Sequence, residues 1–184
     1  MSENLRNYVK ALYGFDAVVR RTDPSRWNAQ SPCQAWKAAD VVAHNIGMCD
    51  MITGFAKGIG SSGPTESTAG DPAAAWSASF DGLLGALDSA GALQTVTATP
   101  WGEMPVDKFL GFVWIDPVIH TWDLATAVGE TPVLDAAQVE RGIAQMIRAG
   151  KSLVGPGRFE PAVEVADDID PVSKLVALSG RSPS

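Results

Sequence analysis

Two histidines and one aspartate are the residues of this sequence whose types and spacing suit metal chemistry. His44 and His120 are the two histidines of the chain, and each falls within a helical pattern of apolar residues. Asp116 precedes His120 by four residues, so the two side chains share one face of a helix. Two imidazole nitrogens and one carboxylate form a common ligand set for catalytic zinc, with a fourth position left for water or substrate. The sequence therefore predicts a divalent-metal site made by His44, Asp116 and His120.

The same residues also have structural interpretations. An inward-facing histidine often belongs to a hydrogen-bond network of the core rather than to a metal site. Asp116 stands directly before Pro117, and Asp followed by Pro is typical of a helix N-cap and the first helical position. A helix through this region could therefore break there, with Asp116 capping its second half. The two roles are compatible, because one carboxylate can cap a helix and also bind a metal.

Neighbouring polar residues are candidates for supporting the histidines. A metal-bound imidazole usually donates its other N–H group to a carboxylate or a carbonyl. Asp40 lies four residues before His44, and Asp123 lies three residues after His120, next to Trp122. Each of these side chains is a candidate partner, and the alternative for each carboxylate is a solvated helix face. No separate general base stands out, and Asp123 is the one candidate for that role.

The spacing of apolar residues predicts a mainly helical chain. Apolar side chains recur every three or four residues over several long stretches, which is the pattern of amphipathic helices. No alternation of strands and helices is present, so a parallel sheet is not expected. We expect an all-α helical bundle with short additional helices and minor extended segments. Helices are predicted over residues 3–21, 36–57, 72–90, 106–128 and 171–179, with another after Asp135, a loop over 58–70 and an extended segment over 93–105.

Composition and charge narrow the class of protein. The 184 residues are 46% hydrophobic and 19% charged, with a formal net charge of −7, which suits one globular domain over residues 1–184. An acidic chain without a basic stripe disfavours nucleic acid and anionic membrane surfaces as partners, and no apolar run is long enough to span a membrane. Two cysteines, Cys33 and Cys49, are too few for a disulfide scaffold. Each could be a soft metal ligand, although a buried and unreactive thiol is the more common role. The polar N-terminus MSENLRNYVK lacks the apolar core of a secretory signal, so we expect a cytoplasmic protein.

Three sequence blocks and the C-terminal stretch resemble a known family. The blocks are PCQAW (residues 32–36), DVVAHNIG (40–47) and HTWDLATAVG (120–129), and the stretch runs from Phe159 to Arg181. Together they resemble actinobacterial single-domain metal-binding proteins of the DinB-like superfamily, which are related to the N-terminal domain of mycothiol-dependent maleylpyruvate isomerase. The resemblance implies a four-helix bundle of up-down-down-up topology with a divalent metal at its mouth. Carried over, its ligand pattern falls on His44, Asp116 and His120, with Asp116 where the pattern usually has Glu.

The resemblance also implies a function. A divalent metal, expected to be zinc with nickel or another metal as alternatives, can lower the pKa of a bound thiol. We therefore expect a metal-dependent thiol S-transferase that joins mycothiol or a similar low-mass thiol to an electrophile. The complete isomerase has a further C-terminal domain, so a transferase is expected rather than an isomerase. The alternatives are a non-catalytic protein that binds a metal or a small molecule, and a metal-dependent hydrolase. Related bundles often pair, which makes a homodimer an additional expectation.

Overall fold

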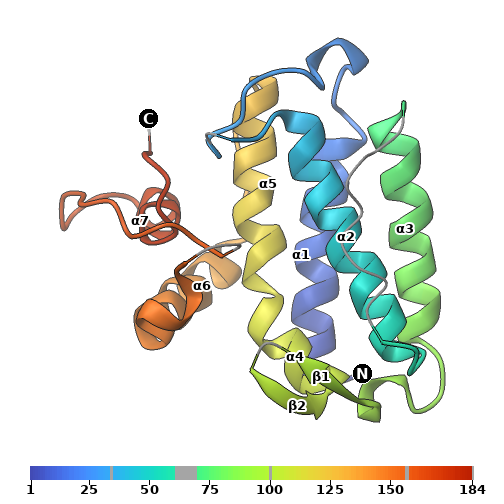
Figure 1. Ribbon diagram of the computed structural model, residues 1–184. Coiled ribbons are helices and arrows are strands. Elements are labelled where there is room, and N and C mark those ends of the chain that lie inside the picture. The colour runs from blue at the N-terminus through green and yellow to red at the C-terminus, as the bar shows by residue number, and fades with distance from the viewer. Residues whose placement is uncertain (34, 61–69, 100, 156–157, 184) are drawn as a thin grey trace.

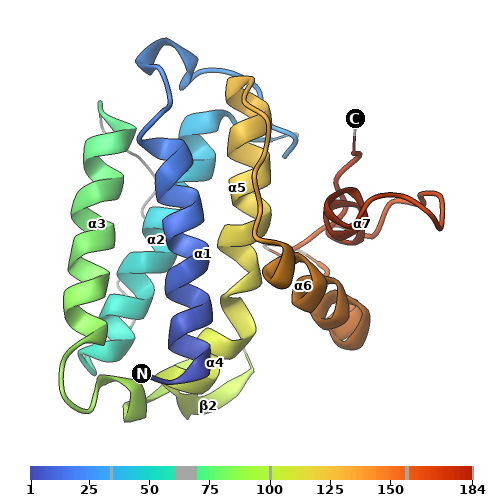
Figure 2. The same ribbon diagram turned by 180° about the vertical axis from the view of Figure 1, so that it is seen from behind.

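Four long helices lie side by side and form a bundle. The computed structural model describes residues 1–33, 35–60, 70–99, 101–155 and 158–183. The bundle consists of α1 (Glu3–Val19), α2 (Ala38–Ala56), α3 (Pro72–Leu87) and α5 (Ile115–Val128). In Figures 1 and 2, α1 and α5 run in one direction while α2 and α3 run in the other. This is the expected up-down-down-up order, and it places α2 and α5 next to each other.

The helix starts follow from short side-chain caps that the sequence contains. Asp71 accepts hydrogen bonds from the first turn of α3, and Pro72 stands at the first helical position. Asp135 caps α6 (Ala136–Ala149), and Asp170 caps α7 (Pro171–Leu178) in the same way. A side-chain oxygen at the N-cap satisfies amide groups that have no partner inside the helix. These ends are therefore set locally, close to where the sequence predicts them.

The predicted helix over residues 106–128 is two helices. A hairpin of β1 (Val96–Thr99) and β2 (Gly102–Pro105) precedes α4 (Val106–Val113), and Trp114 separates α4 from α5. Pro117 has no amide hydrogen for the carbonyl of Val113, so the hydrogen-bond ladder cannot continue through this turn. Trp114 is the N-cap of α5 and makes no side-chain cap bond. Asp116 therefore lies inside the first turn of α5, and its carboxylate is available for contacts across the bundle.

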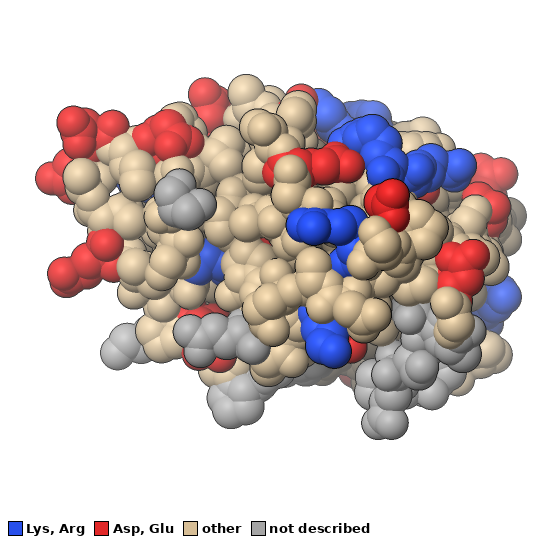
Figure 3. Space-filling view, turned by 90° about the horizontal axis from the view of Figure 1, so that it is seen from above, with Lys and Arg blue, Asp and Glu red and all other residues tan. Residues whose placement is uncertain are grey.

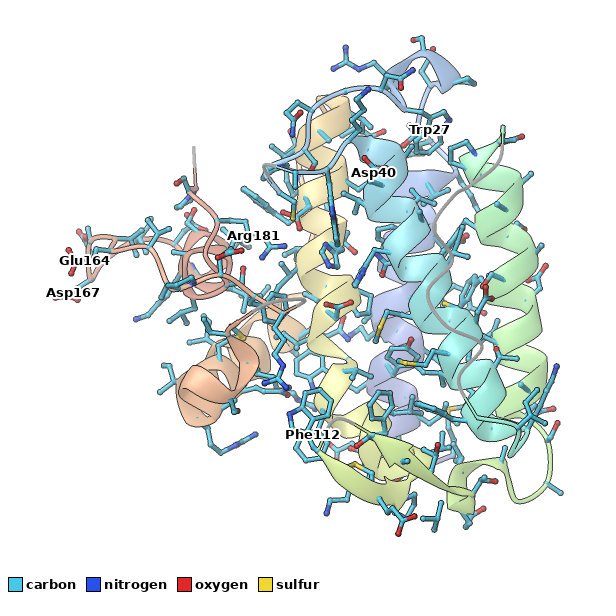
Figure 4. The ribbon with its side chains drawn as sticks, in the orientation of Figure 1. Trp27, Asp40, Phe112, Glu164, Asp167 and Arg181 are labelled. Atoms are coloured by element: carbon cyan, nitrogen blue, oxygen red, sulfur yellow. The ribbon has the colours of Figure 1, made fainter. Side chains whose placement is uncertain are left out.

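The C-terminal segment packs against the outside of the bundle. Helices α6 and α7 lie beside α5 in Figures 1 and 2. Gly142 of α6 permits this close packing, because a Cβ atom there would lie 2.5 Å from Ile115 and 3.1 Å from Leu175. Ile147, which the periodicity places on the buried stripe of α6, is exposed instead. Figure 3 shows acidic side chains gathered over this segment, and Glu164 and Asp167 lie at its outer end in Figure 4.

Shorter elements complete the described part of the chain. Single turns of 3-10 helix are η1 (Pro24–Arg26), η2 (Ala92–Gln94) and η3 (Gly150–Leu153). Most of the predicted loop over 58–70 lies outside the described residues, and Gly58–Gly60 follow α2 without regular structure. Within the described residues, the helices are too short or too polar to cross a membrane.

Candidate metal centre

The three predicted ligands meet between α2 and α5. His44 projects from α2, and its Nε2 lies 2.9 Å from one carboxylate oxygen of Asp116 on α5. The other oxygen of Asp116 lies 3.5 Å from Nε2 of His120, one helical turn further along α5. One donor atom from each of the three residues lies within 4.8 Å of the other two. The structure thus brings together two residues of one helix and one of its neighbour, although 72 positions separate His44 from Asp116.

The spacing of these atoms suits a small divalent cation. Ligand atoms that lie 2.0–2.1 Å from a tetrahedral zinc ion are about 3.4 Å from one another. The observed separations of 2.9 and 3.5 Å bracket that value. The His120 side chain is 4% exposed, whereas that of His44 is 28% exposed. The cluster is therefore buried on the α5 side and reachable from solvent on the α2 side, as a site with one open position requires.

Without an ion, charge holds the cluster together. Burial alone would lower the pKa of His120, but the charge of Asp116 and hydrogen bonds with Asp116 and Asp123 raise it well above its ordinary value. Burial alone would raise the pKa of Asp116, but the neighbouring charges of His44 and His120 outweigh burial and lower it strongly. A carboxylate that stays ionised beside two imidazoles presents the charge that a divalent cation needs.

A short loop places an aromatic ring over the two histidines. Gln30 pairs with Lys37, and the Ser31 amide donates to the Trp36 carbonyl. The ring centre of Trp36 lies 5.0 Å from that of His44 and 5.6 Å from that of His120. Trp36 is half-buried, so its ring forms one wall of the entrance to the cluster.

Asp123 is the predicted partner that contacts a histidine. Its Oδ2 lies 2.9 Å from Nδ1 of His120, and its side chain is fully buried. This contact fixes the orientation of the imidazole and leaves Nε2 directed toward Asp116. Asp40 has a different contact, because its carboxylate accepts the Lys37 amide and caps α2 at the upper end seen in Figure 4. Trp122 is buried on the same helix as His120.

Arg181 is a part of this network that the sequence reasoning missed. Its Nη2 and Nε lie 2.8 and 3.2 Å from the two oxygens of Asp123, and Nη2 is also 2.9 Å from Sγ of Cys33. Figure 4 shows Arg181 reaching from the C-terminal segment toward α5. In the sequence, Arg181 is marked only by its position directly after Gly180, just beyond the end of α7.

The two cysteines differ in their surroundings. Cys33, His120 and Asp123 bring three donor atoms within 4.8 Å of one another, but the guanidinium of Arg181 already contacts both the thiol and the carboxylate. A fixed positive charge there opposes a second cation, so we interpret this group as a hydrogen-bond network. Cys49 is completely buried in the core, and burial raises the pKa of its thiol. A thiol in that setting stays protonated and inert.

Three other tryptophans, Trp76, Trp101 and Trp114, occupy other places in the fold. Trp76 is buried and donates from Nε1 to Asp16. Trp114 is buried at the junction of α4 and α5. Trp101 is partly exposed and stacks on Phe112 at the hairpin end of the bundle, where Figure 4 labels Phe112. Of the four, Trp36 is the one whose ring contacts the candidate ligands.

The fold resembles that of a solved enzyme. The crystal structure of a histidine-to-alanine mutant of mycothiol-dependent maleylpyruvate isomerase matches with a TM-score of 0.60 at 16% identity. The match covers 84% of this chain and 73% of that chain. At this identity, the likeness concerns the fold alone. Coverage of 84% extends past residue 125, so the likeness of fold includes part of the C-terminal segment.

Sequence comparison gives relatives along the whole chain and a family for most of it. Two proteins of Mycobacterium tuberculosis are each 26% identical over 191 residues, with 97% of both chains covered. They are the uncharacterized protein MT0763 of strain CDC 1551 / Oshkosh and the uncharacterized protein Rv0738 of strain ATCC 25618 / H37Rv. Residues 10–125, which include all three candidate ligands, match the family described as mycothiol maleylpyruvate isomerase N-terminal domain. The chain therefore belongs to the mycothiol maleylpyruvate isomerase N-terminal domain family, which confirms the DinB-like resemblance.

Proposed function

We propose that this protein is a metal-dependent thiol S-transferase whose ion is held by His44, Asp116 and His120. The observation that carries the proposal is the meeting of these three side chains at distances that suit zinc, with solvent access beside His44. A divalent cation at this position supplies a thiolate at neutral pH, because it lowers the pKa of a thiol that it binds. The name of the family supports mycothiol as that thiol.

The side chains around the cluster suit this chemistry better than hydrolysis. A hydrolase needs a base within hydrogen-bond reach of its attacking water. Of the carboxylates that contact the histidines, Asp116 faces both imidazoles, and Asp123 is held by Arg181 on the side of His120 away from Asp116. Thiol transfer would need no such base, because a metal ion held by His44, Asp116 and His120 would lower the pKa of a bound thiol. Trp36 forms a wall that excludes water from one side of the reacting sulfur.

The reaction can be tested with mycothiol and monobromobimane. The thiol sulfur forms a bond to the methylene carbon, bromide leaves with the electron pair of its bond, and the thiol proton passes to solvent. We expect zinc-loaded protein to form fluorescent conjugate faster than the uncatalysed rate, and protein treated with a chelator or carrying His120→Ala to form it only at the uncatalysed rate. Metal-loaded protein that conjugates neither mycothiol, bacillithiol nor glutathione above the uncatalysed rate would refute the transferase.

The likeness of fold to the isomerase supports one second candidate. An isomerase of this kind adds a thiol to an unsaturated acid and releases it after rotation about the former double bond, so the thiol is recovered. Maleylpyruvate with mycothiol is the matching assay, because the solved relative is named for that reaction. Isomerisation without conjugation of bimane would favour this candidate over the transferase.

A further inference from the structure

Tyr8 has a buried hydroxyl group without a hydrogen-bond partner among the described residues. The residue lies on the inner face of α1 and is 1% exposed. Buried tyrosine hydroxyls usually find a partner. In the described part of the chain, every fully shielded side-chain nitrogen or oxygen has a partner. The Tyr8 oxygen therefore keeps a small exposed area although the residue as a whole is buried.

The register of α1 against the helices beside it places Tyr8 level with the candidate metal centre. A Cβ atom on Gly111 would contact Asn4, and a Cβ atom on Gly14 would lie 3.9 Å from Thr121. Both pairs are offset by 107 positions, so Tyr8 is level with Ile115, the neighbour of Asp116 in the chain. The helices α1 and α5 run side by side over this length. The tyrosine ring thus extends into the bundle at the height of Asp116.

The electrostatic surroundings of the hydroxyl agree with this position. Burial raises the pKa of Tyr8 well above its ordinary value, and Cys49 and Asp116 raise it further. The group therefore keeps its proton and acts as a donor. Both oxygens of Asp116 contact the histidines, so neither is the hydrogen-bond acceptor of the Tyr8 hydroxyl.

We propose that Tyr8 donates a hydrogen bond to the sulfur of the thiol substrate and so positions that thiol beside His44, Asp116 and His120. This inference rests on the proposed function. It assigns to α1 a role in binding the thiol, in addition to the metal-ligating roles of α2 and α5. A hydrogen bond to a charged acceptor contributes roughly 1.5–3 kcal/mol, which corresponds to about a tenfold to hundredfold change in affinity.

The experiment compares Tyr8→Phe with Tyr13→Phe. The chain has two tyrosines, and Tyr13 lies on the same helix but is 54% exposed, so its variant is a matched control. Zinc affinity is measured by chelator competition, and mycothiol is then titrated into the zinc-loaded proteins by calorimetry. We expect Tyr8→Phe to keep its zinc affinity and to bind mycothiol at least about tenfold more weakly. Tyr13→Phe should match the unaltered protein in both measurements.

A second measurement uses the unaltered sequence and does not depend on how well the variant folds. With 3-fluorotyrosine incorporated, the two tyrosines give two fluorine resonances. Addition of mycothiol to the zinc-loaded protein should shift the resonance of Tyr8 and leave that of Tyr13 in place.

The outcomes separate this inference from the proposed function. Unchanged mycothiol affinity in Tyr8→Phe, or no shift of the Tyr8 resonance, refutes the role of Tyr8 while thiol binding itself stands. Weakened zinc affinity with unchanged mycothiol affinity also refutes it, because the hydroxyl would then support Asp116 as a metal ligand instead of binding the thiol. If the unaltered zinc-loaded protein binds no mycothiol, the thiol function fails and the inference fails with it.

Discussion

Asp116 and Asp123 contact opposite nitrogens of the same imidazole, that of His120. The two carboxylates differ in what else they contact. Asp116 faces a second histidine and lies at the accessible side of the cluster, whereas Asp123 is fully buried and bound by a guanidinium. Their shared imidazole therefore has one nitrogen directed to a site where an ion can enter and one fixed by the protein. This asymmetry is what a metal ligand with its orienting partner requires.

Removal of either histidine should abolish stable metal binding. His44→Ala and His120→Ala each leave two of the three donors, so we expect the zinc content of purified protein to fall well below one ion per chain. Asp40→Asn is the control, because it alters a helix cap and costs about 1 kcal/mol of stability without touching the cluster. Metal content is measured by mass spectrometry, and equal content in all variants would contradict the site.

Asp116→Asn separates metal binding from helix capping. The carboxylate of Asp116 contacts His44 and His120, so we expect loss of its charge to lower the melting temperature of the metal-free variant modestly, while the fold stays intact. Zinc affinity should fall by more than the roughly 10- to 100-fold that orienting partners contribute. Chelator competition and thermal unfolding provide the two readouts. A lowered melting temperature with unchanged zinc affinity would instead assign Asp116 a structural role.

Loss of Arg181 should destabilise the protein and also weaken metal binding. Arg181→Met leaves the buried carboxylate of Asp123 with one charged partner instead of two, and we expect a loss of about 3 kcal/mol in the free energy of unfolding. Zinc affinity should fall by about tenfold, because the orientation of His120 becomes less fixed. Arg141→Met is the matched control, since it breaks an exposed pair with Glu3 that contributes less than about 1 kcal/mol. Equal effects of the two variants on unfolding by urea would contradict the buried network.

Metal uptake should release a proton and strengthen as the pH rises. The raised pKa of His120 keeps its imidazole protonated in the metal-free protein near neutral pH, and a metal ligand must give up that proton. Below the raised pKa, zinc affinity should therefore increase about tenfold per pH unit. Calorimetry in buffers of different ionisation enthalpy counts the protons released. Affinity that stays constant between about pH 6 and about pH 8 would show that no such proton is displaced.

The candidate ligands could be predicted from the sequence because local rules fix them. The four-residue spacing of Asp116 and His120 places both on one helical face, and His44 falls on the apolar stripe of a second helix. Asp71, Asp135 and Asp170 each stand at a helix start, where the carboxylate accepts hydrogen bonds from backbone amides two or three residues further along the chain. Each of these positions depends on neighbours along the chain, which the sequence displays directly, whereas the meeting of His44 with Asp116 across 72 positions was expected from the family resemblance.

Features that depend on distant contacts could not be predicted in the same way. The contact of Arg181 with Asp123 joins residues 58 positions apart, and that with Cys33 joins residues 148 apart. Nothing in the local pattern around Arg181 indicates its partners. A break in the helix was one alternative that Asp116 and Pro117 indicated, but it lies at Trp114 and leaves Asp116 inside α5. Asp40 differs for a local reason, because its carboxylate accepts the Lys37 amide three residues away. The single-domain and homodimer expectations stay predictions.

The contact of Arg181 with Asp123 connects the segment after α7 to His120, an imidazole that would hold the ion. Coupling between two sites is reciprocal, so if the Arg181 contact strengthens zinc binding at His120, zinc binding must stabilise the Arg181 contact by the same free energy. Zinc should therefore slow hydrogen exchange at the amides around Ser179 and Gly180, although these residues lie beyond the stretch from 10 to 125 that defines the family. A protein truncated to that stretch would lose the brace on His120 and hold its ion less tightly than the intact chain.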